Sequence, residues 1–474
     1  MSNKKDVADY EVCQGLADAA ATVDRLCLLY PIYMRSFWSI RSGMIAFKKV
    51  HFFHLKRVRF MRHVIVIGAG IVGLATAHHL LGAGVRVTLV DRDPEGDKAS
   101  FGNAGGIAVT EVIPAAVPGV LWKVPGWLAD PLGPLAIRPG HAPRLIPWLL
   151  RFSRAGRPSE FKRISAALAA LNARVYDDLL PLLAEHNLRE ELLQLGALTV
   201  YEKEAAFDKD AMQWGLKRAW GVEVRTLTGN EAREIEPALG RTITRGVFTP
   251  QWSHVRDPKT LVDKLRQSLL ARGLCIQVAE ACGIRPGLEG SAVSVGLVDG
   301  RWLTADKVVV AAGAWSGLLA QRLGDKVLLE SERGYNTTLP EPGVVLSREV
   351  IFAERHFVAT PLSCGLRVGG AAEFGGLNAP ANFKRSQALA RLAALYLPGL
   401  RTEGGTRWAG HRPATPDSLP VIGASARHPS VIYAFGHGHL GLTQAATTGR
   451  LVSDIALGKP SLVDLEPYAI SRFN

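Results

Sequence analysis

The fold of this chain is decided by residues 61–93, whose sequence is MRHVIVIGAGIVGLATAHHLLGAGVRVTLVDRD. Residues 63–67 form a short, almost uninterrupted apolar run rich in β-branched side chains, which is typical of a strand buried on both faces of a parallel sheet. We expect a helix over residues 71–81 that ends at the glycines of 82–84, because glycine readily adopts the left-handed conformation that ends helices. A second β-run follows at residues 85–90, so the stretch predicts a β-α-β unit.

Three glycines lie between the first strand and the helix at the spacing G-x-G-x-x-G, namely Gly68, Gly70 and Gly73. The first permits a tight turn, the second lets the backbone approach a pyrophosphate, and the third lets the helix pack closely on its strand. Asp91 follows 18 residues after Gly73, where a carboxylate accepts both ribose hydroxyls. The glycine motif alone is weak evidence, but the complete unit predicts an adenine dinucleotide whose phosphates lie at a helix N-terminus. Asp91 argues against a 2′-phosphate on that ribose, and only the neighbouring Arg92 weakens this inference.

Composition limits the class of protein. The chain has 474 residues, of which 47% are hydrophobic, enough for two domains with substantial cores. No run of basic residues carries base-reading features, so we expect no nucleic-acid partner. The five cysteines form neither a C-x-x-C motif nor a metal-ligand spacing, and we expect reduced thiols, no disulfide framework and no metal site. These cysteines are Cys13, Cys27, Cys275, Cys282 and Cys364.

The formal charge of +13 is unevenly spread. Residues 1–60 carry ten Lys and Arg against five Asp and Glu, a net +5 that leaves +8 for the rest, and residues 30–60 mix aromatic and basic side chains with no acid. The segment has no apolar run near the roughly 18 residues of a transmembrane helix and no secretory cleavage site. One interpretation is a basic, aromatic surface that touches anionic lipid at the inner face of the cytoplasmic membrane. We favour a cytoplasmic protein whose native start is Met61, with residues 1–60 from an upstream start codon, because the first strand begins almost at Met61.

Two stretches before residue 160 show little regular periodicity. Residues 99–106, with the sequence ASFGNAGG, form a second small-residue segment that can run alongside a bulky ring system, because almost nothing projects from it. Residues 112–160 are rich in Pro, Trp and Gly, so we expect an irregular excursion over the surface or over a cavity.

The next block has a different pattern. We expect a helix from residue 160, because five apolar residues recur at helical spacing, and a second helix over residues 205–220. Short apolar runs at residues 197–201 and 246–248 are typical of strands. This block therefore predicts a separate domain built on an antiparallel sheet. The five apolar residues of the first helix are Ile164, Leu168, Leu171, Val175 and Leu179.

The chain then returns to the first pattern, except that residues 331–375 are β-rich and amphipathic. The glycine-rich stretch 436–441 opens the last helix, which ends at Gly458, and such a helix N-terminus attracts partial negative charge. The other predicted elements are a helix over 261–271 capped by Gly273, strands over 275–278, 293–298, 307–312 and 431–435, and a helix over 383–396.

We therefore predict an α/β fold in which a Rossmann-like dinucleotide-binding domain is interleaved with an α+β substrate domain on an antiparallel sheet. Residues 1–60 would form an N-terminal extension, either disordered or outside the native chain. The dinucleotide-binding domain would comprise residues 61–111, 255–328 and 407–474, and the substrate domain residues 112–254 and 329–406.

Three further segments carry a family resemblance together with the opening unit. They are KVVVAAGAWS at 307–316, RWAGHRPATPDSLPVIG at 407–423 and YAFGHGHLGLTQAATTGRLVSDIALG at 433–458. On these segments, residues 61–474 resemble the FAD-dependent amine oxidoreductases of the D-amino acid oxidase superfamily, and within it the bacterial D-amino acid dehydrogenases. Three segments, PDSLPVIG at 416–423, FGHGHLGLT at 435–443 and GLRVGGAAEFGG at 365–376, resemble members that act on D-proline-like substrates, including cis-4-hydroxy-D-proline.

The resemblance implies three groups of contacts with FAD. The opening unit would hold the ADP half, the loop after residue 102 would pass near the isoalloxazine ring, and the last glycine-rich stretch would present backbone amides to the flavin pyrimidine edge and ribityl chain. No cysteine lies in residues 433–443 and no histidine in residues 99–106, so we expect FAD to be non-covalent. The implied cofactor-binding residues are Gly68, Ala69, Gly70, Ile71, Val72, Gly73, Asp91, Arg92, Asn103, Ala104, Gly105, Gly438, His439, Leu440, Gly441 and Leu442.

Two residues are candidate catalytic residues by the same resemblance. Arg412, in the segment G-H-R-P, falls where the family places the arginine that grips the substrate carboxylate, and Tyr335 corresponds to a position near the active site. A guanidinium is suited to this role because it is always charged and offers two parallel donors. A structural ion pair is the alternative role for Arg412. For His437 and His439 we favour loop packing over proton transfer.

The predicted function is FAD-dependent oxidation of a D-amino acid to the imino acid and then the 2-oxo acid, by hydride transfer to flavin N5, with electrons passed to a quinone or another electron-transfer partner. D-Proline or cis-4-hydroxy-D-proline is the narrower substrate hypothesis. Three alternatives stay open: a glycine- or sarcosine-type oxidase that uses oxygen, a peripheral membrane flavoprotein with structural FAD, and a nicotinamide-dependent enzyme.

Overall fold

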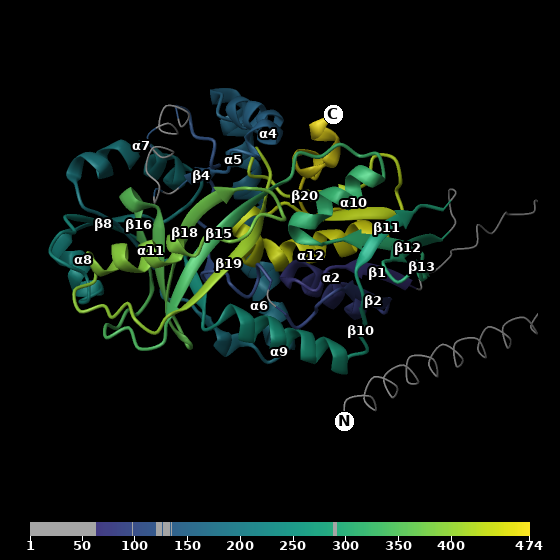
Figure 1. Ribbon diagram of the computed structural model, residues 1–474, viewed down its shortest axis with the longest axis horizontal. Coiled ribbons are helices and arrows are strands. Elements are labelled where there is room, and N and C mark those ends of the chain that lie inside the picture. The colour runs from purple at the N-terminus through teal and green to yellow at the C-terminus, as the bar shows by residue number, and fades with distance from the viewer. Residues whose placement is uncertain (1–62, 97, 120–125, 127–132, 134, 288–291) are drawn as a thin grey trace, which may run out of the picture. The chain divides into compact units, whose positions relative to one another are not determined.

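A computed structural model describes most of the chain from residue 63 onward (Figure 1). Residues Met61–Asn474 form one compact unit. The predicted extension at residues 1–60, including its basic and aromatic segment, lies outside the described residues. The described residues are 63–96, 98–119, 126, 133, 135–287 and 292–474.

A six-stranded sheet contains the opening β-α-β unit. Its strand order is β10-β2-β1-β14-β21-β20, and every neighbouring pair is parallel except the last. The predicted first strand is confirmed at its bounds. The central strands β1, β14 and β21 are almost wholly buried because the sheet is covered on both faces, whereas the edge strand β10 is partly exposed. The strands are β1 (His63–Ile67), β2 (Arg86–Asp91), β10 (Cys275–Val278), β14 (Lys307–Val310), β20 (Val421–Ala424) and β21 (Val431–Phe435).

A second, larger sheet has nine strands. Eight of them follow the order β19-β15-β18-β17-β16-β6-β8-β7, and β4 pairs with β18. It is antiparallel apart from the pairs β16–β6 and β18–β4. Strand β19 pairs along its whole length with β15, so the predicted domain boundary at 406/407 falls at the start of a strand of this large sheet. The strands are β4 (Leu135–Ile137), β6 (Ala197–Tyr201), β7 (Arg225–Thr228), β8 (Arg245–Thr249), β15 (Glu330–Leu339), β16 (Glu349–Phe352), β17 (Phe357–Leu362), β18 (Gly365–Phe374) and β19 (Thr406–Ala414).

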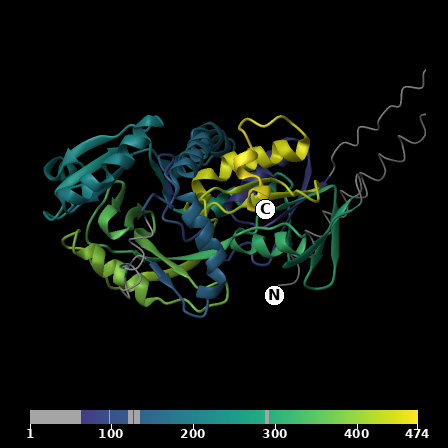
Figure 2. The ribbon, with the colours of Figure 1, turned by 90° about the horizontal axis from the view of Figure 1, so that it is seen from above.

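Two small sheets complete the β-structure. One is antiparallel in the order β11-β12-β13, and the other joins β3, β9 and β5. Figures 1 and 2 agree that β11–β13 lie on the opposite side of α12 (Gly441–Leu457) from α7 and α8. These elements are β3 (Gly106–Ile107), β5 (Leu192–Leu193), β9 (Ser253–Val255), β11 (Ala281–Arg285), β12 (Val293–Leu297), β13 (Trp302–Ala305), α7 (Glu204–Ala219), α8 (Gly229–Ile235), α10 (Ser316–Arg322) and α11 (Lys384–Ala394).

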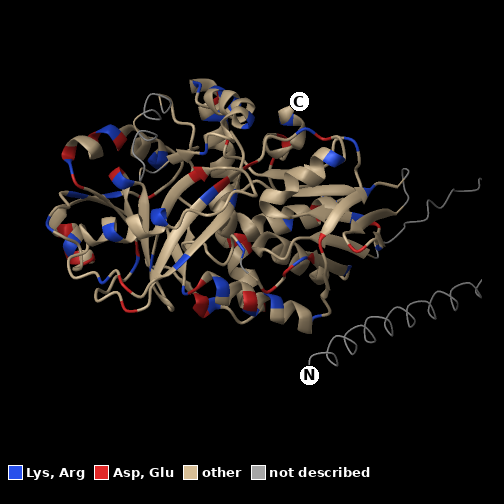
Figure 3. Ribbon diagram, in the orientation of Figure 1, with Lys and Arg blue, Asp and Glu red and all other residues tan. Residues whose placement is uncertain are grey.

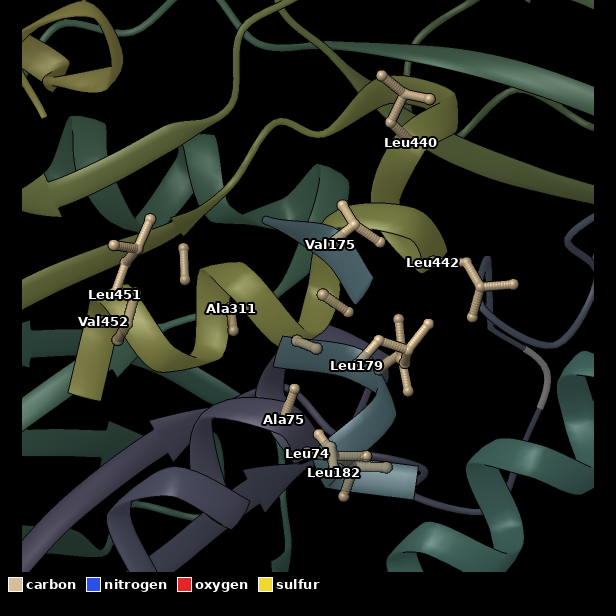
Figure 4. Packing of buried hydrophobic residues seen from close by; sticks show 14 of the residues in the cluster. Leu74, Ala75, Val175, Leu179, Leu182, Ala311, Leu440, Leu442, Leu451 and Val452 are labelled. Carbon is tan, nitrogen blue, oxygen red and sulfur yellow. The ribbon is translucent and has the colours of Figure 1, made fainter. Parts of the chain in front are cut away.

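The main apolar core lies where α2 (Ile71–Gly82) and α12 cross. Figure 4 shows side chains of α6 (Val175–Glu185), such as Leu179 and Leu182, packed beside Leu74 of α2 and Leu442 of α12. Charged side chains of both signs are interspersed on the outer elements, whereas α2 and β1 carry none (Figure 3). Since α2 begins at the glycine turn, this packing fixes the direction in which its N-terminus points.

Two predictions about where helices lie were wrong. The helix predicted from residue 160 is two helices, α5 (Pro158–Asn172) and α6, separated by a turn at 173–174. The apolar spacing continues across the turn, so periodicity alone does not reveal it. The stretch 112–160 is not wholly irregular either, because α4 (Ala142–Ala155) lies within it and buries Leu145 and Trp148. Prolines within α4, including Pro147, suggested a loop, but tertiary packing outweighs their low helix propensity.

Candidate dinucleotide-binding and active site

The glycine turn has the geometry that the sequence predicts. Gly68 adopts φ +112°, a conformation that side chains disfavour, and a Cβ there would lie 2.3 Å from the carbonyl oxygen of Ala311. A Cβ on Gly73 would lie 1.9 Å from the carbonyl oxygen of Gly68. Gly70, the residue that precedes the first turn of α2, has no side chain to cap the helix, and Ser100 Oγ accepts a hydrogen bond from the backbone N–H of Ile71 at 3.1 Å. The helix N-terminus therefore has room for an anion such as a pyrophosphate.

Asp91 is held at the end of β2 by the same turn. Its Oδ2 accepts a hydrogen bond from the backbone N–H of Ala69 at 2.7 Å, and its Oδ1 accepts from Lys98 Nζ and from the backbone N–H of Asp93, both at 2.8 Å. The carboxylate is thus fixed in orientation, and Lys98 would share Oδ1 with a ribose hydroxyl. The guanidinium of Arg92 points elsewhere, 4.7 Å from the ring centre of Trp315.

A cavity of about 850 Å³ joins the glycine turn to the large sheet. This volume lies in the range of ligand and cofactor sites, and together with the glycine turn and the fixed carboxylate it fits FAD. Of the predicted residues, Ala69, Gly73, Gly105 and Leu440 do not line it, although Ala69 and Gly73 shape the turn. The predicted residues that do line it are Gly68, Gly70, Ile71, Val72, Asp91, Arg92, Asn103, Ala104, Tyr335, Arg412, Gly438, His439, Gly441 and Leu442.

The small-residue loop after residue 99 is anchored on the large sheet. Arg367 Nη1 donates to the backbone carbonyl of Asn103 at 2.6 Å, and Asn336 Nδ2 donates to that of Gly102 at 2.7 Å. The Oδ1 of Asn103 accepts from the backbone N–H of Gly105 at 2.7 Å. The loop is therefore fixed against the large sheet, along the wall of the cavity.

The structure separates the two histidines of the last glycine-rich stretch. His437 is buried and hydrogen bonded through Nε2 to Thr448 Oγ1 at 2.9 Å, and burial lowers its pKa to about 3. His439, in the 3-10 turn Gly438–Leu440, exposes its side chain to the cavity. Desolvation lowers the pKa of His439 below its ordinary value. The negative charges of Glu111 and Glu332 oppose this shift, and the positive charge of Arg412 adds to it. Both histidines line the cavity, but His437 is buried and held by Thr448, whereas the side chain of His439 is exposed among charged groups.

Arg412 lies on β19 directly opposite Glu332 on β15. Its Nη1 donates to Glu332 Oε1 and to the backbone carbonyl of Ala371, both at 3.0 Å. Ala371 has φ +58°, at the irregularity where β18 shifts register against β15, and this bulge directs its carbonyl toward the guanidinium. The guanidinium covers Gly334, where a Cβ would lie 2.4 Å from it. Arg412 thus makes the ion pair considered as its alternative role, and it also lines the cavity.

Tyr335, which the resemblance places near the active site, is among the residues that line the cavity, but its ring is buried. Side chains alternate along a strand, so Tyr335 points to the opposite face of β15 from Gly334 and Asn336. Its ring is 1% exposed and belongs to the apolar cluster behind the sheet with Leu389. Its hydroxyl accepts a hydrogen bond from the backbone N–H of Asn382 at 3.0 Å. The structure does not bring this hydroxyl beside Arg412.

Sequence reasoning missed a buried acidic region of the cavity wall. Glu349 on β16 is 3% exposed, accepts a hydrogen bond from Trp252 Nε1 at 3.2 Å, and has no cationic partner among the described residues. Burial raises the pKa of Glu349 to about 8. Nearby, Glu111 forms an ion pair with Lys217 at 2.6 Å, which outweighs burial and leaves the pKa of Glu111 lowered. No local motif marks these residues, because they come together only through the large sheet and the loop.

A glycine turn, a fixed carboxylate and a second glycine-rich helix start around one large cavity define an adenine-dinucleotide-binding protein of the Rossmann type. The profile of the DAO family, described as FAD dependent oxidoreductase, matches residues 63–455. The chain belongs to this family, and it is an FAD-dependent oxidoreductase.

Several known proteins are similar to this chain over most of its length. A D-amino-acid oxidase of Bradyrhizobium diazoefficiens is 37% identical over 421 residues, which is 87% of this chain and 99% of that protein. The structure of an iminodiacetate oxidase from Chelativorans sp. BNC1 matches with a TM-score of 0.65 at 23% identity and covers 86% of this chain and 98% of its own. A glycine oxidase from Geobacillus kaustophilus matches with a TM-score of 0.65 at 22% identity, covering 87% and 99%.

Proposed function

We propose that this protein oxidises a D-amino acid to the corresponding imino acid, which water converts to the 2-oxo acid unless the imine is cyclic. The observation that carries the proposal is the position of Arg412, a partly exposed guanidinium on the wall of the cavity that also contains the glycine turn. The similarity to a D-amino-acid oxidase supports the same substrate class.

The free donors of Arg412 suit a substrate carboxylate. Nη1 makes both hydrogen bonds of the Arg412 guanidinium, whereas Nε and Nη2 donate to no residue that the structure describes. These two groups form one edge of the planar guanidinium, which can bind both oxygens of a carboxylate. A carboxylate held there has its Cα fixed in position, and this orientation accounts for a large part of the rate that enzymes gain.

FAD would supply the acceptor for the hydride that leaves the substrate Cα. The protein would contribute the rest through its own groups. The backbone of residues 438–442 would place amide dipoles beside the cofactor, where fixed dipoles stabilise developing negative charge. The anchored loop at 102–105 would hold the ring in place beside the large sheet.

The test of this function is anaerobic bleaching of the bound flavin by a panel of D- and L-amino acids. Bleaching by one or more D-amino acids, with the L-enantiomers inert, is the expected result. The panel includes D-proline and cis-4-hydroxy-D-proline, the narrower substrates suggested by the resemblance of residues 365–376, 416–423 and 435–443. A yellow protein that no amino acid bleaches would refute the proposal.

The electron acceptor defines two versions of this function. We infer a dehydrogenase that passes electrons to a quinone or another acceptor, from the resemblance of residues 407–458 to D-amino acid dehydrogenases. An oxidase is the second candidate, because the relatives described above are named oxidases. In stopped-flow experiments, a dehydrogenase should be reoxidised slowly by air and quickly by a soluble quinone, and fast reoxidation by air would establish the oxidase.

The cytoplasmic location of this protein stays a prediction. Among the residues that the structure describes, no helix combines the length and apolarity required to cross a bilayer. Deletion of residues 1–60 tests the peripheral-membrane alternative, since an enzyme should keep its turnover without them.

A further inference from the structure

The pair formed by Glu332 and Arg412 has two features that a purely structural ion pair does not need. Both side chains remain accessible, at 26% and 28% exposure respectively. The contact also uses only Nη1 of the guanidinium, so the pair presents a free cationic edge next to a carboxylate.

The guanidinium is held in this orientation from three sides. The carbonyl of Ala371 accepts from Nη1 at 3.0 Å, and the plane of the guanidinium lies over Gly334, where no side chain intervenes. Glu332 fixes the third side. Because the bulge carbonyl also holds Nη1, Arg412 has a partner that does not depend on Glu332.

An α-amino acid carries its ammonium and carboxylate groups a few bonds apart, a separation close to the length of a hydrogen bond. A carboxylate and a guanidinium whose contact is 3.0 Å long present the complementary charges at a similar spacing. We propose that Glu332 binds the ammonium group of the substrate while the Nε and Nη2 edge of Arg412 binds its carboxylate. This inference rests on the proposed function, because it requires an amino acid as the ligand.

The pair would then select for zwitterions. A plain carboxylate on Arg412 would lie beside the negative charge of Glu332, and like charges at close range disfavour binding. The 2-oxo acid formed from the product has no ammonium group, so the same repulsion would favour its release. Glu332 is thus assigned as a specificity-determining residue, and its role is more than that of a structural ion-pair partner of Arg412.

The discriminating ligands are 2-aminoisobutyrate and pivalate. Neither has a Cα hydrogen, so neither can be oxidised, and the two differ only in that an ammonium group replaces a methyl group. Calorimetric titration of the FAD-loaded protein therefore measures binding without turnover. We expect Glu332→Gln to weaken 2-aminoisobutyrate roughly ten- to a hundredfold and to leave pivalate unchanged or bound more tightly.

Glu330→Gln is the matched control. Glu330 lies two residues along the same strand and face, and its carboxylate pairs with His141 Nε2 at 2.9 Å instead of with Arg412. It should leave the ratio of the two affinities unchanged. If Glu332→Gln loses flavin, Glu332→Asp keeps the charge and shortens the side chain, and it should lower the affinity for 2-aminoisobutyrate alone.

Four outcomes would overturn the assignment. Equal tightening of both ligands in Glu332→Gln would mean that Glu332 only competes for Arg412, and equal weakening would mean that it only holds Arg412 in place. An unchanged affinity for 2-aminoisobutyrate, in a protein whose wild type is bleached by D-amino acids, would refute the role of Glu332 alone. Wild-type protein that binds pivalate but no amino acid, and that no amino acid bleaches, would refute the proposed function as well.

Discussion

Trp252 donates its indole N–H to the carboxylate of Glu349 across 3.2 Å, and both residues line the cavity. Desolvation acts most strongly on this buried acid, and among the residues that the structure describes its other influences are the neutral donor Trp252 and the negative charge of Glu111. Burial therefore dominates, and the acid should be largely protonated at neutral pH.

This relationship predicts how stability depends on pH. The pKa of Glu349 is about 8 in the folded protein and near 4.5 when unfolded. Below pH 4.5 both states are protonated, and between pH 4.5 and 8 only the unfolded state ionises, so the stabilisation is lost progressively as pH rises to 8. Since one pKa unit corresponds to about 1.4 kcal/mol, the full loss is on the order of 5 kcal/mol.

Glu349→Gln, which cannot ionise, should therefore become more stable than the wild type as pH rises from 4.5 to 8. Urea unfolding at several pH values measures this difference. Histidines that titrate in the same range cancel, because both proteins contain them. A difference that does not change with pH would show that Glu349 is ionised in the folded protein.

Arg412→Ala should weaken amino acid binding by roughly 1.5–3 kcal/mol, or about ten- to a hundredfold, without loss of bound flavin. The substitution removes the carboxylate partner and leaves Glu332 unpaired. Arg412→Lys should recover part of the affinity, because an ammonium group keeps the charge but not the paired donors. Titration of flavin absorbance measures both, with Arg407→Ala on the same strand as the control. An unchanged affinity in Arg412→Ala would place the carboxylate site elsewhere.

The crossing of α2 and α12 should be intolerant of one added methyl group. A Cβ on Gly449 would lie 2.5 Å from the backbone carbonyl carbon of Ala75, so Gly449→Ala should destabilise the protein by about 1–3 kcal/mol. Gly82, the last residue of α2, has nothing within 4 Å of its Cβ position. Gly82→Ala should be neutral or stabilise by up to about 1 kcal/mol. Thermal unfolding of the two variants compares them directly, and equal effects would contradict the close approach of the two helices at Gly449.

Substitutions of the two histidines in the last glycine-rich stretch should affect different properties, stability for His437 and substrate affinity for His439. His437→Ala removes a buried hydrogen bond with Thr448 and should destabilise the protein by about 1–3 kcal/mol. His439→Ala alters a cavity-facing side chain and should leave stability within about 0.5 kcal/mol while changing the affinity for substrate. Denaturant unfolding and ligand titration on the same samples separate the two effects. A loss of stability in His439→Ala would assign it a packing role instead.

FAD is expected to leave the protein on unfolding, because the binding segments offer no evident attachment residue. Acid precipitation should yield a colourless pellet and a yellow supernatant, and a yellow pellet would demonstrate a covalent link. Asp91→Ala removes the acceptor for Ala69 N–H and the partner of Lys98, so the purified variant should retain less flavin than the wild type. Lys98→Ala is the control, since it frees Asp91 Oδ1 and should retain flavin at least as well.

Much of the dinucleotide-binding part could be predicted from the sequence. The strand His63–Ile67, the glycine turn and the helix α2 depend on neighbours within about twenty residues, so periodicity and glycine spacing suffice to predict them. The helix α4 was missed because its prolines suggested a loop, although the side chains that it buries, Leu145 and Trp148, stand at helical spacing.

The candidate site depended on contacts between residues far apart in the chain. The sequence by itself, through its resemblance to a known family, indicated Arg412 as a candidate for binding a carboxylate. Only the tertiary structure decided that Glu332, 80 residues away, lies beside it, that Tyr335 points to the opposite face, and that Glu349 is buried with no cationic partner in the described part of the chain. The physical reason is that strand register and the bulge at Ala371 set these relations, and both result from the packing of the whole sheet.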